Sequence, residues 1–205
     1  MKFLIALFSA LLFTHAPLAQ EAAPDALVKN VTNEVLDIVR KDKDIQSGST
    51  RKAIELVEAK VLPHFNFARM TQLAMARDWR QASPAQQKVL TDEFRSLLVR
   101  TYSKALTEYK NQTIDFKPFA TKPGETDVRV RTEIRQPGGK HIELDYYLEK
   151  TNAGWKVYDI EVGGISLVTN YRESFATEVR NSGIDGLIKT LQAKNKSGEA
   201  TSVKK

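Results

Sequence analysis

Two different periods of apolar and polar residues divide the 205-residue chain into zones. Up to about residue 109 the apolar positions recur every three or four residues, which is the spacing of helices with one buried face. This spacing predicts helices over residues 27–39, 50–61, 65–79 and 84–109. Ser49 or Thr50 can cap the second helix, and Ser83 followed by Pro84 marks the start of the long fourth helix.

From Thr113 onward the period changes to two, which is typical of strands with one buried face. The alternation predicts strands around residues 114–116, 128–134, 142–148 and 154–162. Turn residues at 137–139 and 152–154 separate the last three strands. Short turns join neighbouring antiparallel strands, so we expect a four-stranded antiparallel meander with one apolar face and one wet face.

Gly163 and Gly164 follow the fourth strand, and after them the apolar residues return to helical spacing. The pattern predicts helices over residues 165–181 and 184–193, separated by Ser182 and Gly183. Residues 194–205 are polar, and we expect a disordered tail there. These patterns predict a single α+β domain over residues 22–193, in which a curved four-stranded antiparallel sheet is covered on its apolar face by helices.

The N-terminal residues have the pattern of a secretory signal peptide, which we place at residues 1–19. A basic Lys2 precedes an apolar run over residues 3–13, and small residues lead to an expected cleavage after Ala19. The run is shorter than the roughly 20 apolar residues that span a bilayer, which disfavours the alternative of a retained anchor. We therefore expect the mature protein to be exported.

Composition narrows the chemistry open to an exported protein. The sequence contains no cysteine, which excludes a lipid-modified cysteine, a disulfide and a thiolate metal site. The formal charge of +6 becomes +5 without Lys2, because 30 basic and 25 acidic residues then remain. This excess is modest, and the basic residues are not interleaved with aromatic ones on one face, so we expect no nucleic-acid partner.

Motifs for catalysis and metal binding are absent from the sequence. It has no HExxH, Walker or dinucleotide-binding motif, and no glycine follows Ser166 where a nucleophile elbow requires one. Beyond the expected signal peptide there are two histidines, His64 and His141, and we place both at the surface. We therefore assign no catalytic residue, no metal ligand and no cofactor.

Three stretches together resemble the MlaC/toluene-tolerance family of periplasmic proteins. They are FARMTQLAMARDWRQASPAQQKVLTDEFRSLLVRTYSKAL over residues 67–106, WKVYDIEVGGISLVTNYRESF over residues 155–175, and GIDGLI over residues 183–188. The resemblance extends in order over about residues 22–191. Family members usually have a glycine just before the aromatic residue of the first helix junction. This chain departs from that pattern, with Arg77 near the expected place.

The resemblance implies a soluble periplasmic carrier that moves phospholipids between the outer and inner membranes and so maintains the lipid asymmetry of the outer membrane. It implies a pocket between the apolar face of the sheet and the helices that encloses the acyl chains. The implied partners are a phospholipid, an outer-membrane lipoprotein complex and an inner-membrane ABC-transporter complex, and the carrier is expected to be a monomer. We expect acyl chains to contact Phe94, Leu98, Tyr102, Leu144, Tyr146, Ile165, Val168 and Tyr171.

Two other functions remain open at this point. A cone-shaped fold like that of nuclear transport factor could house an enzyme such as an isomerase, for which Asp145 and Asp159 are the sheet carboxylates to check. An apolar groove could instead bind a helix of a partner protein. Basic residues on the outer strand face alternate with acids, which favours a solvated face over a docking surface. They are Arg129, Arg131, Arg135 and Lys140.

Overall fold

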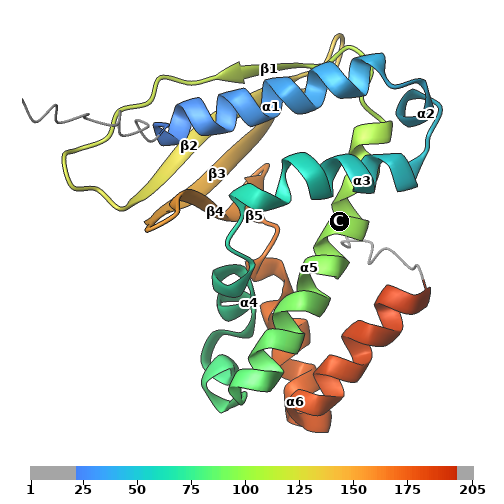
Figure 1. Cartoon of the computed structure of the whole chain (residues 1–205), viewed down its shortest axis with the longest axis vertical. Helices are drawn as coiled ribbons and strands as arrows, with labels where there is room; N and C mark the ends of the chain where they lie inside the picture. The colour runs from blue at the N-terminus through green and yellow to red at the C-terminus, as the bar shows by residue number, and fades with distance from the viewer. Residues whose placement is uncertain (1–21, 198–205) are drawn as a thin grey trace, which may run out of the picture.

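The computed structural model describes residues 22–197, in which a curved sheet lies above a layer of helices (Figure 1). The α-helices are α1 (Pro24–Lys41), α2 (Lys43–Gln46), α3 (Thr50–Lys60), α4 (Phe67–Met75), α5 (Pro84–Thr107) and α6 (Arg172–Ser197). The short 3₁₀ helices are η1 (Leu62–His64), η2 (Ala76–Gln81) and η3 (Thr169–Tyr171). The strands are β1 (Thr113–Phe116), β2 (Asp127–Arg135), β3 (Ile142–Thr151), β4 (Gly154–Val162) and β5 (Ile165–Ser166). The α+β class predicted from the sequence is confirmed.

The sheet has five strands in the order β1-β2-β3-β4-β5, and all neighbouring strands are antiparallel. The four predicted strands are present, but the prediction of a four-stranded sheet is wrong by one strand. Ile165 and Ser166, which were expected to open a helix, form β5 and pair with Val162 and Glu161 of β4.

A two-residue turn explains the fifth strand. Gly163 and Gly164 both have positive φ, 56° and 83°, which is the backbone of a type I′ hairpin turn. The turn folds the chain directly back onto β4. The helical section therefore begins with η3 at Thr169 rather than at residue 165.

The strands separate an apolar face from a polar face, as the alternation predicts. On the apolar face Val130 pairs with Tyr146, which in turn pairs with Ile160. These side chains belong to or pack against an apolar cluster that includes Val28 of α1. α1 packs against β2 along this face, so a helix covers part of the apolar face as expected (Figure 1).

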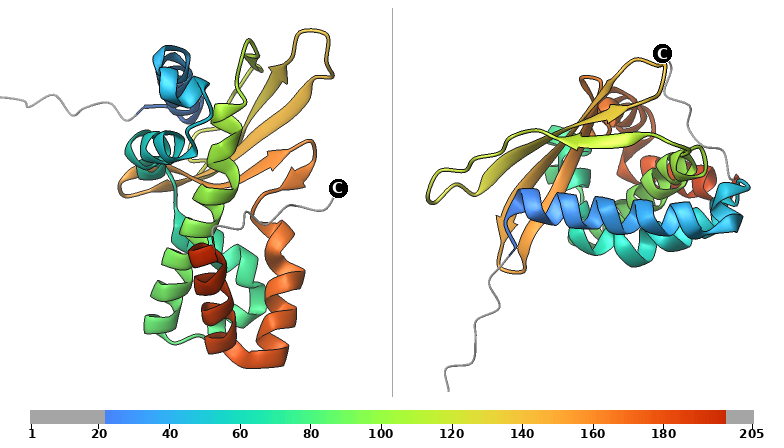
Figure 2. Two further views of the ribbon diagram at one scale, coloured as in Figure 1. Left: turned by 90° about the vertical axis from the view of Figure 1, so that its right-hand side faces the viewer. Right: turned by 90° about the horizontal axis from the view of Figure 1, so that it is seen from above.

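The helices α4, α5 and α6 form the second layer, and the left view of Figure 2 shows it below the sheet with α1 and α3 to one side. α5 begins with the predicted cap, because Ser83 Oγ accepts from the amide of Gln86 at 3.2 Å and Gln86 Oε1 accepts from the amide of Ser83 at 2.9 Å. The ring of Phe94 lies edge-on to the rings of Tyr171 and Phe175, with centroids 5.1 and 5.2 Å away. A large apolar cluster, the helical cluster, fills this layer.

The C-terminal helical region breaks where the sequence predicts. Gly183 has φ 72° inside α6, so the chain changes direction between two helical segments. α6 continues to Ser197, and Asn195 Nδ2 donates to a carboxylate oxygen of Glu93 on α5 at 2.7 Å. The expected signal peptide and the rest of the expected tail lie outside the described residues. Within residues 22–197, no helix has both the length and the apolar character needed to cross a bilayer.

Candidate functional site

The eight residues expected to contact acyl chains fall into two groups, one in each layer. The larger group belongs to the helical cluster or packs against it: Phe94, Leu98, Tyr102, Val168 and Tyr171. Phe94 and Val168 are fully buried. The helical spacing along α5 and around η3 therefore predicted that these five residues lie together, and the structure places them in one cluster. Their contact with lipid stays a prediction.

Leu144, Tyr146 and Ile165 form the smaller group, on the apolar face of the sheet. Tyr146 packs against the cluster shared with α1, and burial raises the pKa of its hydroxyl. Leu144 is half-buried and pairs with Val162, which pairs with Ile165 of β5. The expectation that Ile165 points inward from a helix is wrong, because this residue lies at the sheet edge and is 54% exposed.

Leu144 and Ile165 belong to a partly exposed apolar surface at one end of the sheet, which we term the apolar row. It crosses four strands and consists of Ile134, Ile142, Leu144, Val162 and Ile165. Each is half-buried or exposed, and none is part of the three apolar clusters of residues 22–197. A contiguous apolar surface of this kind is suited to an apolar ligand. Sequence alternation alone could have identified Ile142 and Val162.

The enclosed pocket implied by the family resemblance stays a prediction. Two hollows in the described part of the molecule have volumes of about 440 and 220 Å³, and none of the eight residues lines either of them. α5 packs mainly against α3, α4 and α6. The apolar row is therefore the accessible part of the expected site.

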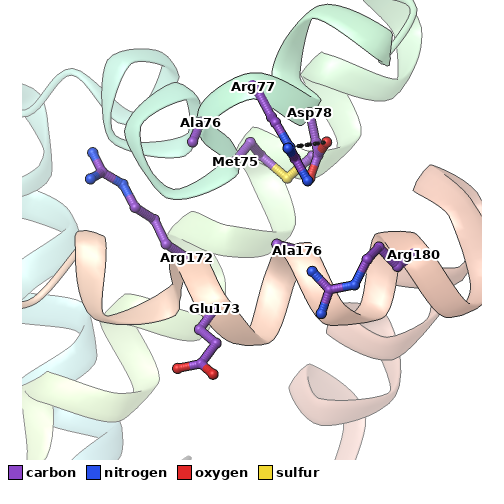
Figure 3. Close-up of a pocket in the computed structure, with 8 residues that line it drawn as sticks. All are labelled: Met75, Ala76, Arg77, Asp78, Arg172, Glu173, Ala176 and Arg180. Carbon is purple, nitrogen blue, oxygen red and sulfur yellow. Dashed lines mark ion pairs between the residues drawn. The ribbon is translucent and has the colours of Figure 1, made fainter.

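The larger hollow lies between η2 and α6 (Figure 3). Its lining comprises Met75, Ala76, Arg77, Asp78, Arg172, Glu173, Ala176 and Arg180. Three guanidinium groups beside apolar side chains are suited to a carboxylate or phosphate group. Arg172 Nε donates to the carbonyl of Leu73, 99 positions earlier in the chain. Sequence reasoning missed this site because no local pattern brings such distant segments together.

Ala76, in the lining of the larger hollow, has an unusual backbone conformation. Its φ of 49° and ψ of −122° lie in a region that glycine adopts readily and alanine does not. This conformation ends α4 and leads the chain into η2. From the resemblance we expect the departure from the family's glycine near Arg77, and the positive φ lies one residue earlier, at Ala76.

The smaller hollow lies on the polar face of β2, beside Arg129 and Arg131. Arg129 Nε donates to the buried carboxylate of Asp145 at 2.9 Å. Arg135 forms an ion pair with Asp115 of β1. Two of the four basic residues of the outer strand face, Arg129 and Arg135, are thus paired with acids, and the choice between a solvated face and a docking surface stays a prediction.

Asp145 and Asp159, the carboxylates considered for catalysis, are both buried and both engaged. Asp145 is 4% exposed and accepts from Arg129. Asp159 accepts from the hydroxyl of Ser166 and from the amide of Ile160, and burial raises its pKa. These contacts stabilise the sheet and the passage from β5 to η3, so each carboxylate has a structural role.

Known proteins resemble this chain over most of its length. A match to the MlaC protein family covers residues 29–193. Toluene tolerance protein ttg2D of Pseudomonas putida is 26% identical over 178 residues, which are 85% of this chain and 82% of that protein. The intermembrane phospholipid transport system binding protein MlaC of Haemophilus influenzae is 24% identical over 187 residues, which are 90% of this chain and 87% of that protein.

A solved structure has the same fold. The phospholipid-binding protein of Ralstonia solanacearum, determined in complex with a phospholipid, is 40% identical to this chain. The two structures superpose with a TM-score of 0.79, over 86% of this chain and 99% of that one. This chain therefore belongs to the MlaC protein family.

Proposed function

We propose that this protein binds a phospholipid by its acyl chains and carries it through the periplasm between the outer and inner membranes. The apolar row carries the proposal, because it offers accessible aliphatic side chains across four strands of the sheet. The phospholipid bound to the Ralstonia solanacearum protein supports this ligand class. The name of the Haemophilus influenzae relative supports a role in transport between membranes.

The free energy of acyl-chain burial explains why such a carrier is required. Each buried methylene contributes about 0.8 kcal/mol, so a two-chain lipid with about thirty methylenes loses about 20–25 kcal/mol when its chains enter water. In this proposal the acyl chains lie along the apolar row, between the sheet and the helical cluster. The space that opens between these two layers is the enclosed pocket. The head group stays at the mouth of the pocket.

A carrier of this kind works as a monomer between two membranes. The signal peptide expected at residues 1–19 directs it to the periplasm, where it docks in turn on an outer-membrane lipoprotein complex and on an inner-membrane ABC-transporter complex. The relatives have names of lipid-binding transport proteins rather than of enzymes. The structural roles of Asp145 and Asp159 also favour binding over catalysis.

Native mass spectrometry of the protein purified from cells tests the proposal, and we expect a co-purified phospholipid. Leu144→Asp places a charge in the apolar row and should abolish lipid binding, because a carboxylate beside acyl chains must lose its water. Val89→Asp is the matched control. Val89 is also half-buried and lies near the start of α5. Figure 1 shows the start of this helix at the end of the helical layer away from the sheet.

Circular dichroism establishes first that both variants are folded. A folded Leu144→Asp protein that keeps its lipid contradicts the apolar row as the binding site. A wild-type protein that contains no lipid and takes up none from phospholipid vesicles contradicts the function itself, and favours an enzyme or a groove for a partner helix.

A further inference from the structure

Three hydroxyl groups in the helical layer are buried with no hydrogen-bond partner outside their own group. They are Thr101 Oγ1 and Tyr102 Oη on α5 and Tyr171 Oη at the end of η3. Within residues 22–197 no residue outside this group accepts from them, and the three hydroxyls interact with one another. Tyr171 as a whole is only 5% exposed. A buried donor without an acceptor is unfavourable, so native proteins rarely keep one unless a ligand or water satisfies it.

These hydroxyls lie close to one another. Thr101 and Tyr102 are the two groups whose hydroxyls lower the pKa of Tyr171, against the larger effect of burial, which raises it. The rings of Tyr102 and Tyr171 pack in the helical cluster, where Phe94 lies edge-on to Tyr171. Three donors therefore meet inside an otherwise apolar environment.

The neighbouring carboxylate does not satisfy these donors. Asp159 is near enough to raise the pKa of Tyr102, although burial is the larger cause. Its two oxygens accept instead from Ser166 and from the amide of Ile160. The three hydroxyls therefore have only one another in the described part of the chain, and a ligand that reaches this part of the layer can supply the missing acceptor.

The position of the hydroxyls relates them to the apolar row. η3 follows β5 directly, and the amide of Leu167 between them donates to the carbonyl of Ile160 on β4 at 2.8 Å. The segment that leads into η3 is thus tied to the sheet next to Ile165, the exposed end of the apolar row. A ligand whose chains lie along the row can place its next chemical group beside the hydroxyls.

The apolar surroundings of the three hydroxyls determine which chemical group of the ligand can lie beside them. A phosphate would bring its charge among the apolar side chains of the helical cluster, where desolvation is costly. An ester carbonyl is neutral and accepts hydrogen bonds. In a diacyl phospholipid the ester carbonyls lie where the acyl chains join the glycerol. They are therefore the first polar groups of the lipid beyond chains that lie along the apolar row.

We propose that Tyr102 and Tyr171, which lie beside Thr101, donate hydrogen bonds from their own hydroxyls to the ester carbonyl oxygens of a bound diacyl phospholipid. This inference rests on the proposed function and extends it. The hydroxyls recognise the linkage between chain and glycerol, so the protein distinguishes ester-linked from ether-linked lipids while the head group remains outside.

Two synthetic lipids with the same head group and chain length test the inference, one with ester and one with ether linkages. The delipidated wild-type protein should bind the diester lipid about tenfold more tightly, which corresponds to one or two net hydrogen bonds. The double variant Tyr102→Phe/Tyr171→Phe should bind both lipids equally. It should stay folded, because phenylalanine keeps the rings and removes only the unpaired donors.

Tyr147→Phe is the matched control, because its hydroxyl donates to Glu161 on the polar face of the sheet at 3.0 Å. This variant should keep the full preference for the diester lipid. Equal affinity of the wild type for both lipids overturns the inference and leaves the proposed function intact, as does a preference that persists in the double variant. A wild type that binds neither lipid contradicts the proposed function and the inference together.

Discussion

The guanidinium group of Arg69 lies over the ring of Tyr158, with its central carbon 3.6 Å from the ring centroid. The same group donates to Glu149 and, at 2.8 Å, to Asp127. The hydroxyl of Tyr158 donates to Asp127 at 2.6 Å, which closes the network. Because Arg69 belongs to α4 and its partners to β2, β3 and β4, this network fixes the sheet on the helical layer.

Arg69→Ala should lower the free energy of unfolding by about 2 kcal/mol, because it removes a cation–π contact and several charge-assisted hydrogen bonds in a partly exposed site. Arg69→Lys should recover less than half of this loss, since an ammonium lacks the planar fork. Arg51→Ala, which removes an exposed pair with Glu55, should cost less than about 0.5 kcal/mol. Urea denaturation measures all three, and equal losses for the two alanine variants would contradict the role of Arg69.

Ala76→Gly should raise the free energy of unfolding by about 1 kcal/mol. The substitution relieves a positive-φ conformation that costs an alanine about 1–3 kcal/mol, and part of this gain is offset by the greater freedom of glycine in the unfolded chain. Ala68→Gly, at an exposed position of α4, is the control and should lose about 1 kcal/mol. The two substitutions should shift the melting temperature in opposite directions, which calorimetry measures. A lower melting temperature in both variants would refute the assignment of strain to Ala76.

The Gly163–Gly164 turn should tolerate asparagine at its first position but not a β-branched residue at its second. Nothing lies within 4 Å of a Cβ added at either glycine, so the backbone alone decides the outcome. Gly163→Asn should be nearly neutral, because Asn-Gly suits a type I′ turn, whereas Gly164→Val should cost about 1–3 kcal/mol. Hydrogen exchange at the Leu167 amide, which bonds to Ile160 across the hairpin, should accelerate in the valine variant only.

Asp159 should make the protein less stable as the pH rises. Burial raises its pKa in the folded state, so the fold binds this proton more tightly than the unfolded chain does. The resulting stabilisation is fully present below the unfolded pKa of about 3.9 and is lost as the pH rises through the folded pKa. Asp159→Asn cannot titrate, so its stability relative to wild type should increase as the pH rises above about 4. Denaturation at a series of pH values measures this difference, and a constant difference would contradict the raised pKa.

Local patterns predicted the parts of the fold that local chemistry determines. Ser83 and Pro84 start α5 because capping depends on neighbouring residues, and the alternation in β2 and β3 follows from the pleat of a strand. β5 was missed because two residues carry no period, and because Ile165 and Val168 happen to have helical spacing. The paired glycines before Ile165 were the available signal, since such a pair favours a tight hairpin turn.

The candidate site was predictable only where a single element contains it. The face of α5 with Phe94, Leu98 and Tyr102 follows from one helical repeat. The extent of the apolar row depends on strand register and on how far α1 covers the sheet. The unpaired hydroxyl of Tyr171 has no sequence signal, because hydrogen-bond satisfaction is a property of the packed molecule.

At the end of the sheet that contains the apolar row, both edge strands are short, and this affects how copies of the protein meet. β5 has two residues before the chain turns into η3, and β1 has four. A long exposed strand edge is a template on which another chain can add a strand, and short edges prevent such pairing. A sheet that ends in accessible aliphatic side chains would otherwise be prone to edge-to-edge aggregation. The brevity of β1 and β5 thus leaves little strand edge beside the apolar row on which a second copy could add a strand, while the row itself stays open to a ligand.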